Sequence, residues 1–124
     1  MISEINGKLK QKKDSSVILD VNGMCYEVMI PPAVMKNLDA VSGDDTAISL
    51  KVYHYYQMDQ SKAIPVLVGF LNDVERDFFE QFITVSGVGP KAACRALSLS
   101  FPVIAEAIDK GDMSLLKTLP GIGE

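Results

Sequence analysis

The sequence predicts a β barrel followed by a helical part, in a chain of 124 residues. Three observations support this prediction. Apolar and polar residues alternate through much of the first 70 residues, which is the period of a strand. The spacing becomes helical at Leu71, and the helical part carries two similar glycine turns 34 residues apart. A chain of this length forms one small domain or two very small ones, and we expect residues 1–70 and 71–124 to be two.

The first strands are expected at residues 1–9 and on both sides of Asn22-Gly23. This dipeptide accepts positive φ at both positions and therefore favours a two-residue hairpin turn. Pro31 and Pro32 end the second strand of the hairpin, because proline has no backbone N–H to donate to a neighbouring strand. The alternating apolar positions are Val17, Leu19 and Val21 before the turn, and Met24, Tyr26, Val28 and Ile30 after it.

The rest of the strand-rich part is expected to contain one helical turn, one long strand, a polar hairpin tip and a returning strand. These elements are predicted at residues 33–38, 46–56, 57–62 and 64–70, in that order. The long strand places Ile48, Leu50 and Val52 on one face, and Pro65 is tolerated near a strand start or on an edge. Five short antiparallel strands fit a small closed barrel of the OB type, which removes its own edges.

The helical part begins with Asn72, which can cap a helix, and with Glu75 in the capping-box position. Its apolar stripe consists of Val74, Phe78 and Phe82, spaced i, i+4 and i+8, with Phe79 and Ile83 beside them. Three more helices are predicted at residues 90–97, 100–109 and 112–118. Lys110-Gly111 stops the second of these three.

Composition argues against several functions. The net charge of −4 disfavours a general nucleic-acid coat, so any phosphate binding must be local. No apolar run approaches the ~18–20 residues of a membrane span, and we expect a cytoplasmic protein. Cys25 and Cys94 lack a CxxC partner and are interpreted as free thiols of a reducing cytosol. With His54 as the single histidine and no P-loop or nucleophile–base pair, we expect no metal, no cofactor and no catalysis.

The stretch SGVGPK, residues 86–91, raises the question of why two glycines and a proline follow a good helix. Gly87 and Gly89 can take conformations that cost other residues energy, so the chain can reverse quickly. Val88 is expected to tuck inward, and Pro90 suits the first helical position. The predicted result is a helix–turn–helix unit whose bare N–H groups lie beside a positive helix end, where anions bind.

Lys91 and Arg95 lie one helical turn apart and can direct their charges to the same place. A phosphate oxygen is the expected ligand, held without any preference for base sequence. The later stretch LPGIGE repeats the pattern through Gly121, Ile122 and Gly123. A single Gly-x-Gly turn between helices is often only a turn, whereas two copies in matching context favour a pair of phosphate clamps.

The stretches SGVGPKAA and LPGIG resemble the paired helix–hairpin–helix motifs of the RuvA family of bacterial Holliday junction-binding proteins. MISEINGKL is similar to the first strand of that family, DVNGMCYEV to its hairpin, and VGFLNDVERDFFEQFITVSGVGPKAA to its entry into the helices. The match runs through the chain in order. The matching residues are Met1, Ile2, Gly7, Tyr26, Glu27, Val28, Gly69, Phe70, Glu75, Arg76, Phe79, Gly87, Val88, Gly89, Pro90 and Lys91.

The resemblance implies an OB-fold domain followed by tandem helix–hairpin–helix motifs, the second of them incomplete. It implies a non-catalytic homotetramer, or an octamer, that holds an open four-way DNA junction by its phosphates in recombination and repair. The RuvB ATPase, which drives branch migration, and the RuvC resolvase would be partners of such an assembly. The implied DNA-binding residues are Gly87, Val88, Gly89, Lys91, Ala92 and Arg95 in the first clamp, and Gly121, Ile122 and Gly123 in the second.

The chain departs from the family pattern in three places. The resemblance would make Asp59 part of an acidic pin at the junction centre, but Met58 stands where a second acid is usual and Lys62 follows. Glu124 stands where a cation or neutral residue is common. We also expect a fragment without the C-terminal motor-binding domain, which would not couple to the ATPase.

Two other functions remain open: a DNA-binding module without junction preference, and an oligomeric scaffold with inert hairpins. Three groups of side chains bear on this choice. Tyr53, Tyr55 and Tyr56 could stack bases or only pack; Lys8, Lys10, Lys12 and Lys13 could touch DNA or only be solvated; Asp73, Glu75, Asp77 and Glu80 form an acidic helix face. His54 is expected to pack in a strand.

Overall fold

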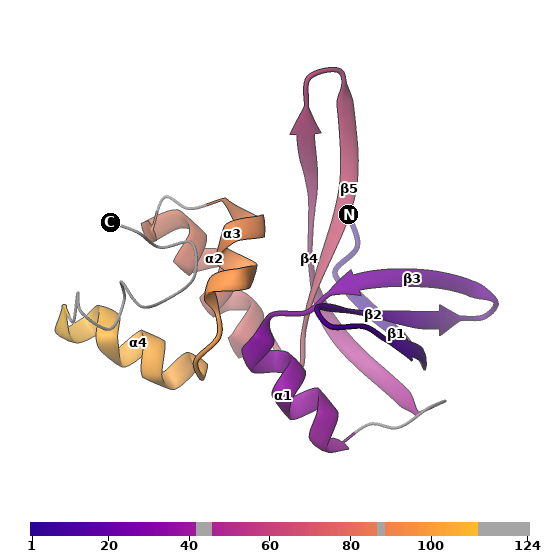
Figure 1. Ribbon diagram of the computed structural model, residues 1–124, viewed down its shortest axis with the longest axis horizontal. Helices are drawn as coiled ribbons and strands as arrows, with labels where there is room; N and C mark the ends of the chain where they lie inside the picture. The colour runs from indigo at the N-terminus through magenta and orange to yellow at the C-terminus, as the bar shows by residue number, and fades with distance from the viewer. Residues whose placement is uncertain (42–45, 87–88, 112–124) are drawn as a thin grey trace.

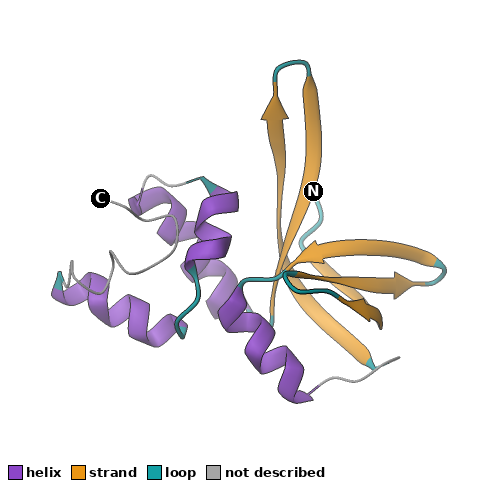
Figure 2. Ribbon diagram, in the orientation of Figure 1, coloured by secondary structure: helices purple, strands orange, loops and turns teal. Residues whose placement is uncertain are grey.

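The structure is a computed structural model that describes residues 1–41, 46–86 and 89–111 (Figure 1, Figure 2). Five strands form a closed barrel in the order β1-β2-β3-β5-β4. The strands are β1 (Glu4–Lys12), β2 (Ser16–Val21), β3 (Met24–Met29), β4 (Ala47–Asp59) and β5 (Lys62–Phe70). The predicted five-stranded barrel is therefore confirmed, and it agrees with the OB type.

One pair of strands is parallel, which corrects the expectation of a wholly antiparallel barrel. β3 and β5 run in the same direction and meet at Met29 and Val68. The reason is geometric: an odd number of strands cannot close into a ring in which every neighbour is antiparallel. The other four pairings are antiparallel, as predicted.

The hairpin between β2 and β3 turns at Asn22-Gly23, as predicted. Asn22 has a φ of 53° and Gly23 a φ of 93°, so both residues occupy the left-handed region that this turn requires. The Gly23 N–H donates to Asp20 Oδ1 at 2.8 Å, which fixes the turn from within the loop. This turn sets the register in which Val17 pairs with Val28 inside the barrel.

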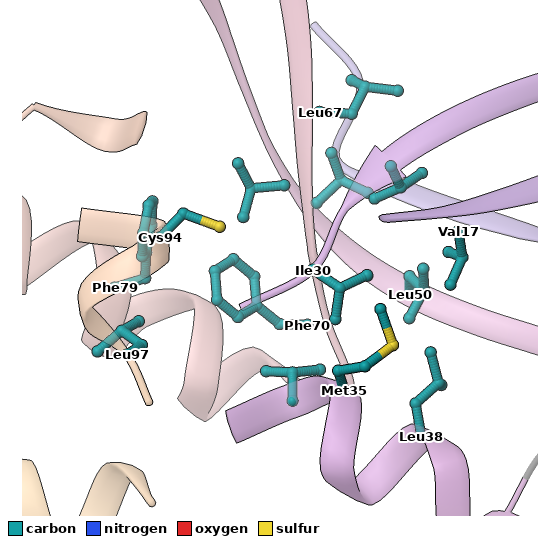
Figure 3. Packing of buried hydrophobic residues seen from close by; sticks show 14 of the residues in the cluster. Val17, Ile30, Met35, Leu38, Leu50, Leu67, Phe70, Phe79, Cys94 and Leu97 are labelled. Carbon is teal, nitrogen blue, oxygen red and sulfur yellow. The ribbon is translucent and has the colours of Figure 1, made fainter. Parts of the chain in front are cut away.

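Helix α1 (Pro32–Val41) is longer than the single turn that the sequence predicts. Val34 and Leu38 are fully buried and Met35 nearly so, at the spacing of one helical face. Figure 3 shows Met35 and Leu38 directed towards Ile30 and Leu50 of the barrel. The helix therefore gains its extra turns from tertiary burial, which the short apolar stretch did not reveal.

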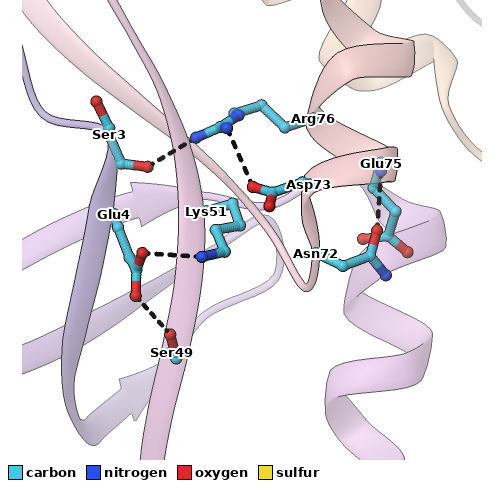
Figure 4. A network of polar contacts seen from close by, with 8 residues as sticks. All are labelled: Ser3, Glu4, Ser49, Lys51, Asn72, Asp73, Glu75 and Arg76. Carbon is cyan, nitrogen blue, oxygen red and sulfur yellow. Dashed lines mark hydrogen bonds and ion pairs between the residues drawn. The ribbon is translucent and has the colours of Figure 1, made fainter.

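Helix α2 (Asp73–Ser86) begins with the predicted capping box. The Glu75 N–H donates to Asn72 Oδ1 at 2.9 Å (Figure 4). The Glu75 carboxylate accepts from the Leu71 N–H, one residue before Asn72, at 2.9 Å. Phe79 and Phe82 are buried as predicted. Val74, predicted for the same stripe, is 77% exposed, because it lines an open pocket together with Lys36 of α1 and Phe78.

Barrel and helices share one hydrophobic core. The Phe70 ring at the end of β5 lies 5.1 Å from the Phe79 ring of α2, and Tyr53 of β4 lies 5.5 Å from Phe79. The buried cluster continues without a break from Leu19 in the barrel to Leu97 beyond the third helix. Helical and strand parts therefore hold each other in place through apolar burial.

Two shorter helices complete the described part of the chain. Helix α3 (Pro90–Ala96) and helix α4 (Phe101–Lys110) lie close to the predicted positions. Gly111 has a φ of 68°, the left-handed conformation that ends α4 as predicted. The helix predicted at residues 112–118 lies outside the described residues.

The hairpin of β4 and β5 projects from the barrel as a two-stranded arm (Figure 1). We call residues 55–66 the β4–β5 arm; among the described residues these segments pair only with each other. The predicted polar tip of six residues is wrong, because pairing continues to Asp59 and Lys62 and only Gln60 and Ser61 form the turn. Pro65 occupies an edge position, as predicted.

We predict that Gly7→Ala destabilises the barrel. A Cβ at Gly7 would lie 2.7 Å from the main-chain oxygen of Asp20 and 2.9 Å from Val21 Cγ2, so β1 and β2 would have to separate. The free energy of unfolding should fall by about 1–3 kcal/mol in urea titrations. In the control Gly89→Ala, the new Cβ has no neighbour within 4 Å, so stability should hold or rise by up to about 1 kcal/mol. Equal effects of the two substitutions would contradict this account.

Candidate nucleic-acid interface

The candidate interface begins at Gly89, immediately before α3. Its φ of −66° and ψ of 163° are ordinary extended values, which any residue can adopt. The expectation that Gly89 supplies an unusual turn conformation is therefore wrong. What the absence of a side chain provides is space: apart from Gly89 and its two chain neighbours, no atom of the described residues lies within 4 Å of a Cβ built at this position. The backbone is thus open to close approach by a ligand.

The first turn of α3 presents main-chain amides next to this open position. Pro90 occupies the first helical turn as predicted, and the first helical bond that involves described residues runs from the Ala93 N–H to the Gly89 carbonyl at 2.9 Å. The amides of Lys91 and Ala92 precede it, at positions where helices leave N–H groups without a partner in the helix.

Helix α3 has one buried face and one cationic face. Ala93, Cys94 and Ala96 are buried against the core, and Figure 3 shows the Cys94 thiol directed towards the barrel. Lys91 and Arg95 are exposed, one turn apart, and neither forms an ion pair with a residue that the structure describes. The two cations therefore lie one turn apart on the exposed side of α3, and their convergence on one phosphate stays a prediction.

Hydrogen bonds to α1 fix the C-terminal end of α3. The Ala33 N–H donates to the Leu97 carbonyl at 2.9 Å, and Lys36 Nζ lies 3.4 Å from the Ser98 carbonyl. Because Val34 and Leu38 of α1 are buried in the core, these bonds connect the cationic helix to the core of the molecule.

A second polar link joins the start of α2 to the first strand of the barrel (Figure 4). Arg76 donates to the Ser3 carbonyl at 3.0 Å and pairs with Asp73 at 3.1 Å. Beside it, Lys51 Nζ lies 2.8 Å from Glu4 Oε1, and this bond lowers the pKa of the Glu4 carboxyl below its ordinary value. Such exposed ion pairs contribute little energy, and of these contacts only the hydrogen bond from Arg76 to Ser3 joins α2 to the barrel.

A cleft of about 430 Å³ separates α3 from the β4–β5 arm. Lys91 and Arg95 form its helical wall, and Tyr55, Gln57 and Val66 its arm wall. The sequence analysis named Tyr55 only as one of three tyrosines that could stack bases, and it did not name Gln57 as a candidate site residue. No local pattern could reveal this arrangement, because the two walls come from segments about 40 residues apart that only the shared core brings together.

The tip of the arm differs from an acidic pin. Met58 is 73% exposed, and the position of Asp59 in β4 pairs with that of Lys62 in β5. The tip therefore combines one acid, one cation and an exposed thioether. The pin role of Asp59 stays a prediction.

Several predicted DNA-binding residues lie outside the described residues, namely Gly87, Val88, Gly121, Ile122 and Gly123. The first clamp is therefore described only from Gly89 onwards. Of its remaining members, Lys91 and Arg95 are exposed and Ala92 is half-buried.

Two further side chains singled out in the sequence form contacts within the protein. His54 Nδ1 accepts from the Ile2 N–H at 3.0 Å and so fixes the start of the chain against β4. Lys13 pairs with Glu27 at 3.3 Å. Among the residues that the structure describes, no group of three or more His, Cys, Asp or Glu side chains could hold a metal ion. No helix within the described ranges is long and apolar enough to cross a membrane.

Fold and surface together define a class: small closed barrels of the OB type joined to a helical part with a local cationic face. Residues 1–62 match the family of the RuvA N-terminal domain. The chain belongs to this family.

Similar proteins extend the match beyond the barrel. The Holliday junction branch migration complex subunit RuvA of Desulforapulum autotrophicum is 37% identical over 123 residues, which are 99% of this chain and 56% of that protein. The proteins of the same name from Desulfosudis oleivorans and Borreliella burgdorferi are 38% and 37% identical, with 58% and 59% of their lengths covered. The chain thus spans a little over half the length of these relatives.

We predict that the two cysteines react very differently with thiol reagents. Cys25 is exposed, whereas burial raises the pKa of the Cys94 thiol to about 11, so almost no thiolate forms at pH 8. Titration of the native chain with Ellman's reagent should show one fast thiol, and a second only after unfolding. In Cys25→Ser, only the slow thiol should remain. Fast reaction of both thiols would show that α3 does not pack as described.

Proposed function

We propose that this chain is the DNA-binding part of a Holliday junction branch migration complex subunit and that it holds four-way junction DNA by its phosphates. The observation that carries this proposal is the surface at Gly89, Lys91 and Arg95, where an open backbone position lies beside two exposed cations. Membership of the RuvA family supplies the substrate class, since the similar proteins are named for the Holliday junction.

The proposed chemistry is that of a phosphate clamp in a helix–hairpin–helix motif. A phosphate oxygen approaches the main chain at Gly89, where no side chain intervenes, and accepts from amides at the start of α3. Lys91 and Arg95 neutralise the phosphodiester charge from the same side. Residues 121–123 form the second clamp by analogy with the first. The net charge of −4 requires binding of this local kind.

The proposal assigns no catalysis to this chain. In the longer protein, a homotetramer or octamer would present four such surfaces, or eight, to the junction. It would target the RuvB ATPase to the junction, with RuvC as a further partner. Binding of the ATPase is not proposed for residues 1–124 alone.

A second candidate is a DNA-binding module without preference for junctions. The arm tip favours it, because Met58 and Lys62 accompany the single acid Asp59 and weaken any repulsion of phosphate there.

Gel-shift assays with a four-way junction, a duplex and a single strand, each at two salt concentrations, separate the candidates. Preference for the junction with strong salt dependence supports the proposal. Equal affinities favour the second candidate, and the absence of binding would leave a scaffold with inert hairpins.

We predict that Lys91→Glu weakens junction binding to a similar extent for all base sequences. The plot of log Kobs against log salt concentration should also become shallower by about one, as expected when one phosphate contact is lost. Lys110→Glu is the matched control, because Lys110 lies on α4 and pairs with Glu106 at 2.7 Å. Equal effects of the two variants would mean that the clamp does not lie at α3.

We predict that Gly89→Ala weakens junction binding without loss of folding stability. The added methyl group fits the free protein but occupies the space through which a phosphate would approach the backbone. Fluorescence anisotropy with a labelled junction should show lower affinity, while urea titrations show unchanged or higher stability. Unchanged affinity would exclude close approach of a phosphate at this position.

A further inference from the structure

The cleft between α3 and the β4–β5 arm has the chemistry of a nucleotide site. Its volume of about 430 Å³ lies in the range of about 300–1,000 Å³ that is typical of small-molecule pockets. Such a space admits one nucleotide but excludes a double helix. Its floor is apolar, formed by Met29, Val68 and the buried Cys94 among others.

The two walls of the cleft differ in character. The wall from α3 carries Lys91 and Arg95, both exposed and without an ion-pair partner among the residues that the structure describes. The opposite wall carries the Tyr55 ring and the Gln57 amide. Two cations facing an aromatic ring across an apolar floor complement the phosphate and the base of a single nucleotide.

Strand alternation selects Tyr55 from the three neighbouring tyrosines. Tyr55 pairs with Val66 and faces the cleft, whereas Tyr56 pairs with Pro65 and points to the opposite face of the arm. Tyr53 packs on Phe79 at 5.5 Å and belongs to the core. Burial raises the pKa of Tyr55, so its hydroxyl stays a neutral hydrogen-bond donor.

We propose that this cleft binds one unpaired nucleotide of the DNA, with the base against the Tyr55 ring and the phosphate held by Lys91 and Arg95. The inference rests on the proposed function, because it assumes that DNA already lies on α3. It extends that function, since the clamp at Gly89 contacts only backbone and would not distinguish a branch point from a duplex. Gln57 is placed to bond to the edge of the base, and its amide both donates and accepts, so any base fits.

The test compares Tyr55→Leu with Tyr56→Leu in three binding assays. The ligands are an oligothymidylate, a four-way junction with one unpaired thymine at the crossover, and a blunt duplex. Tyr55→Leu should lower the affinity for the first two about 5- to 150-fold, the loss expected for one base–aromatic stack, and leave duplex binding unchanged. Tyr56→Leu, which removes a ring that is 57% exposed on the other face, should change none of the three.

A second measurement uses the unaltered chain and so does not depend on how Tyr55→Leu folds. An oligothymidylate with one 5-iododeoxyuridine, irradiated in the complex, should cross-link to Tyr55, as identified by mass spectrometry of the peptides. Cross-linking only at Tyr56 or Met58 would overturn the proposal. It would also be overturned if no cross-link formed and Tyr55→Leu bound the DNAs as tightly as the unaltered chain. In that last case a protein segment becomes the better occupant of the cleft.

The outcomes also separate this inference from the function on which it rests. If the unaltered chain binds the junction and the duplex, and Tyr55→Leu binds all three DNAs with the same affinity as the unaltered chain, the nucleotide site is wrong and the phosphate clamp stands. If the unaltered chain binds none of the three DNAs, the proposed function fails, and the nucleotide site fails with it.

Discussion

The contact between Phe70 and Phe79 is the constraint on which the rest of the molecule depends. Phe70 is the last residue of the barrel, and Phe79 lies two turns into α2, so their packing fixes the path of the chain where strands give way to helices. Tyr53 and Phe101 join the same aromatic group. The aromatic group packs the barrel against α2 and the start of α4, and the cationic face of α3 lies on the same core.

The position of the proposed nucleic-acid surface is therefore set by the core. Cys94 and Ala93 turn one side of α3 inward, which leaves Lys91 and Arg95 outward beside the arm. The Arg76–Ser3 and Ala33–Leu97 hydrogen bonds then restrict rotation of the helices on the barrel. The chain has a net charge of −4, which would repel a phosphate group. Phosphate binding by this chain therefore requires cations that are grouped at one place, as Lys91 and Arg95 are.

Features set by neighbouring residues could be predicted from the sequence, and features set by packing could not. The turn at Asn22-Gly23 and the cap at Asn72 follow from local residue types. The length of α1 and the exposure of Val74 depend on which elements pack against them in the fold, and periodicity does not encode this. At the candidate site, the two cations of α3 could be predicted from the sequence. The ordinary φ of Gly89 and the position of Tyr55 in the wall of the cleft could not, because both depend on how the chain folds.

The single-sided pairing of the arm has a consequence for solubility. Beyond the barrel, β5 exposes a free edge of N–H and C=O groups, which in other proteins recruits strands from neighbouring chains. Pro65 lacks an N–H donor and interrupts that edge. Pro65 thus disfavours the growth of an intermolecular β-sheet along β5, on the part of the hairpin that extends furthest from the barrel.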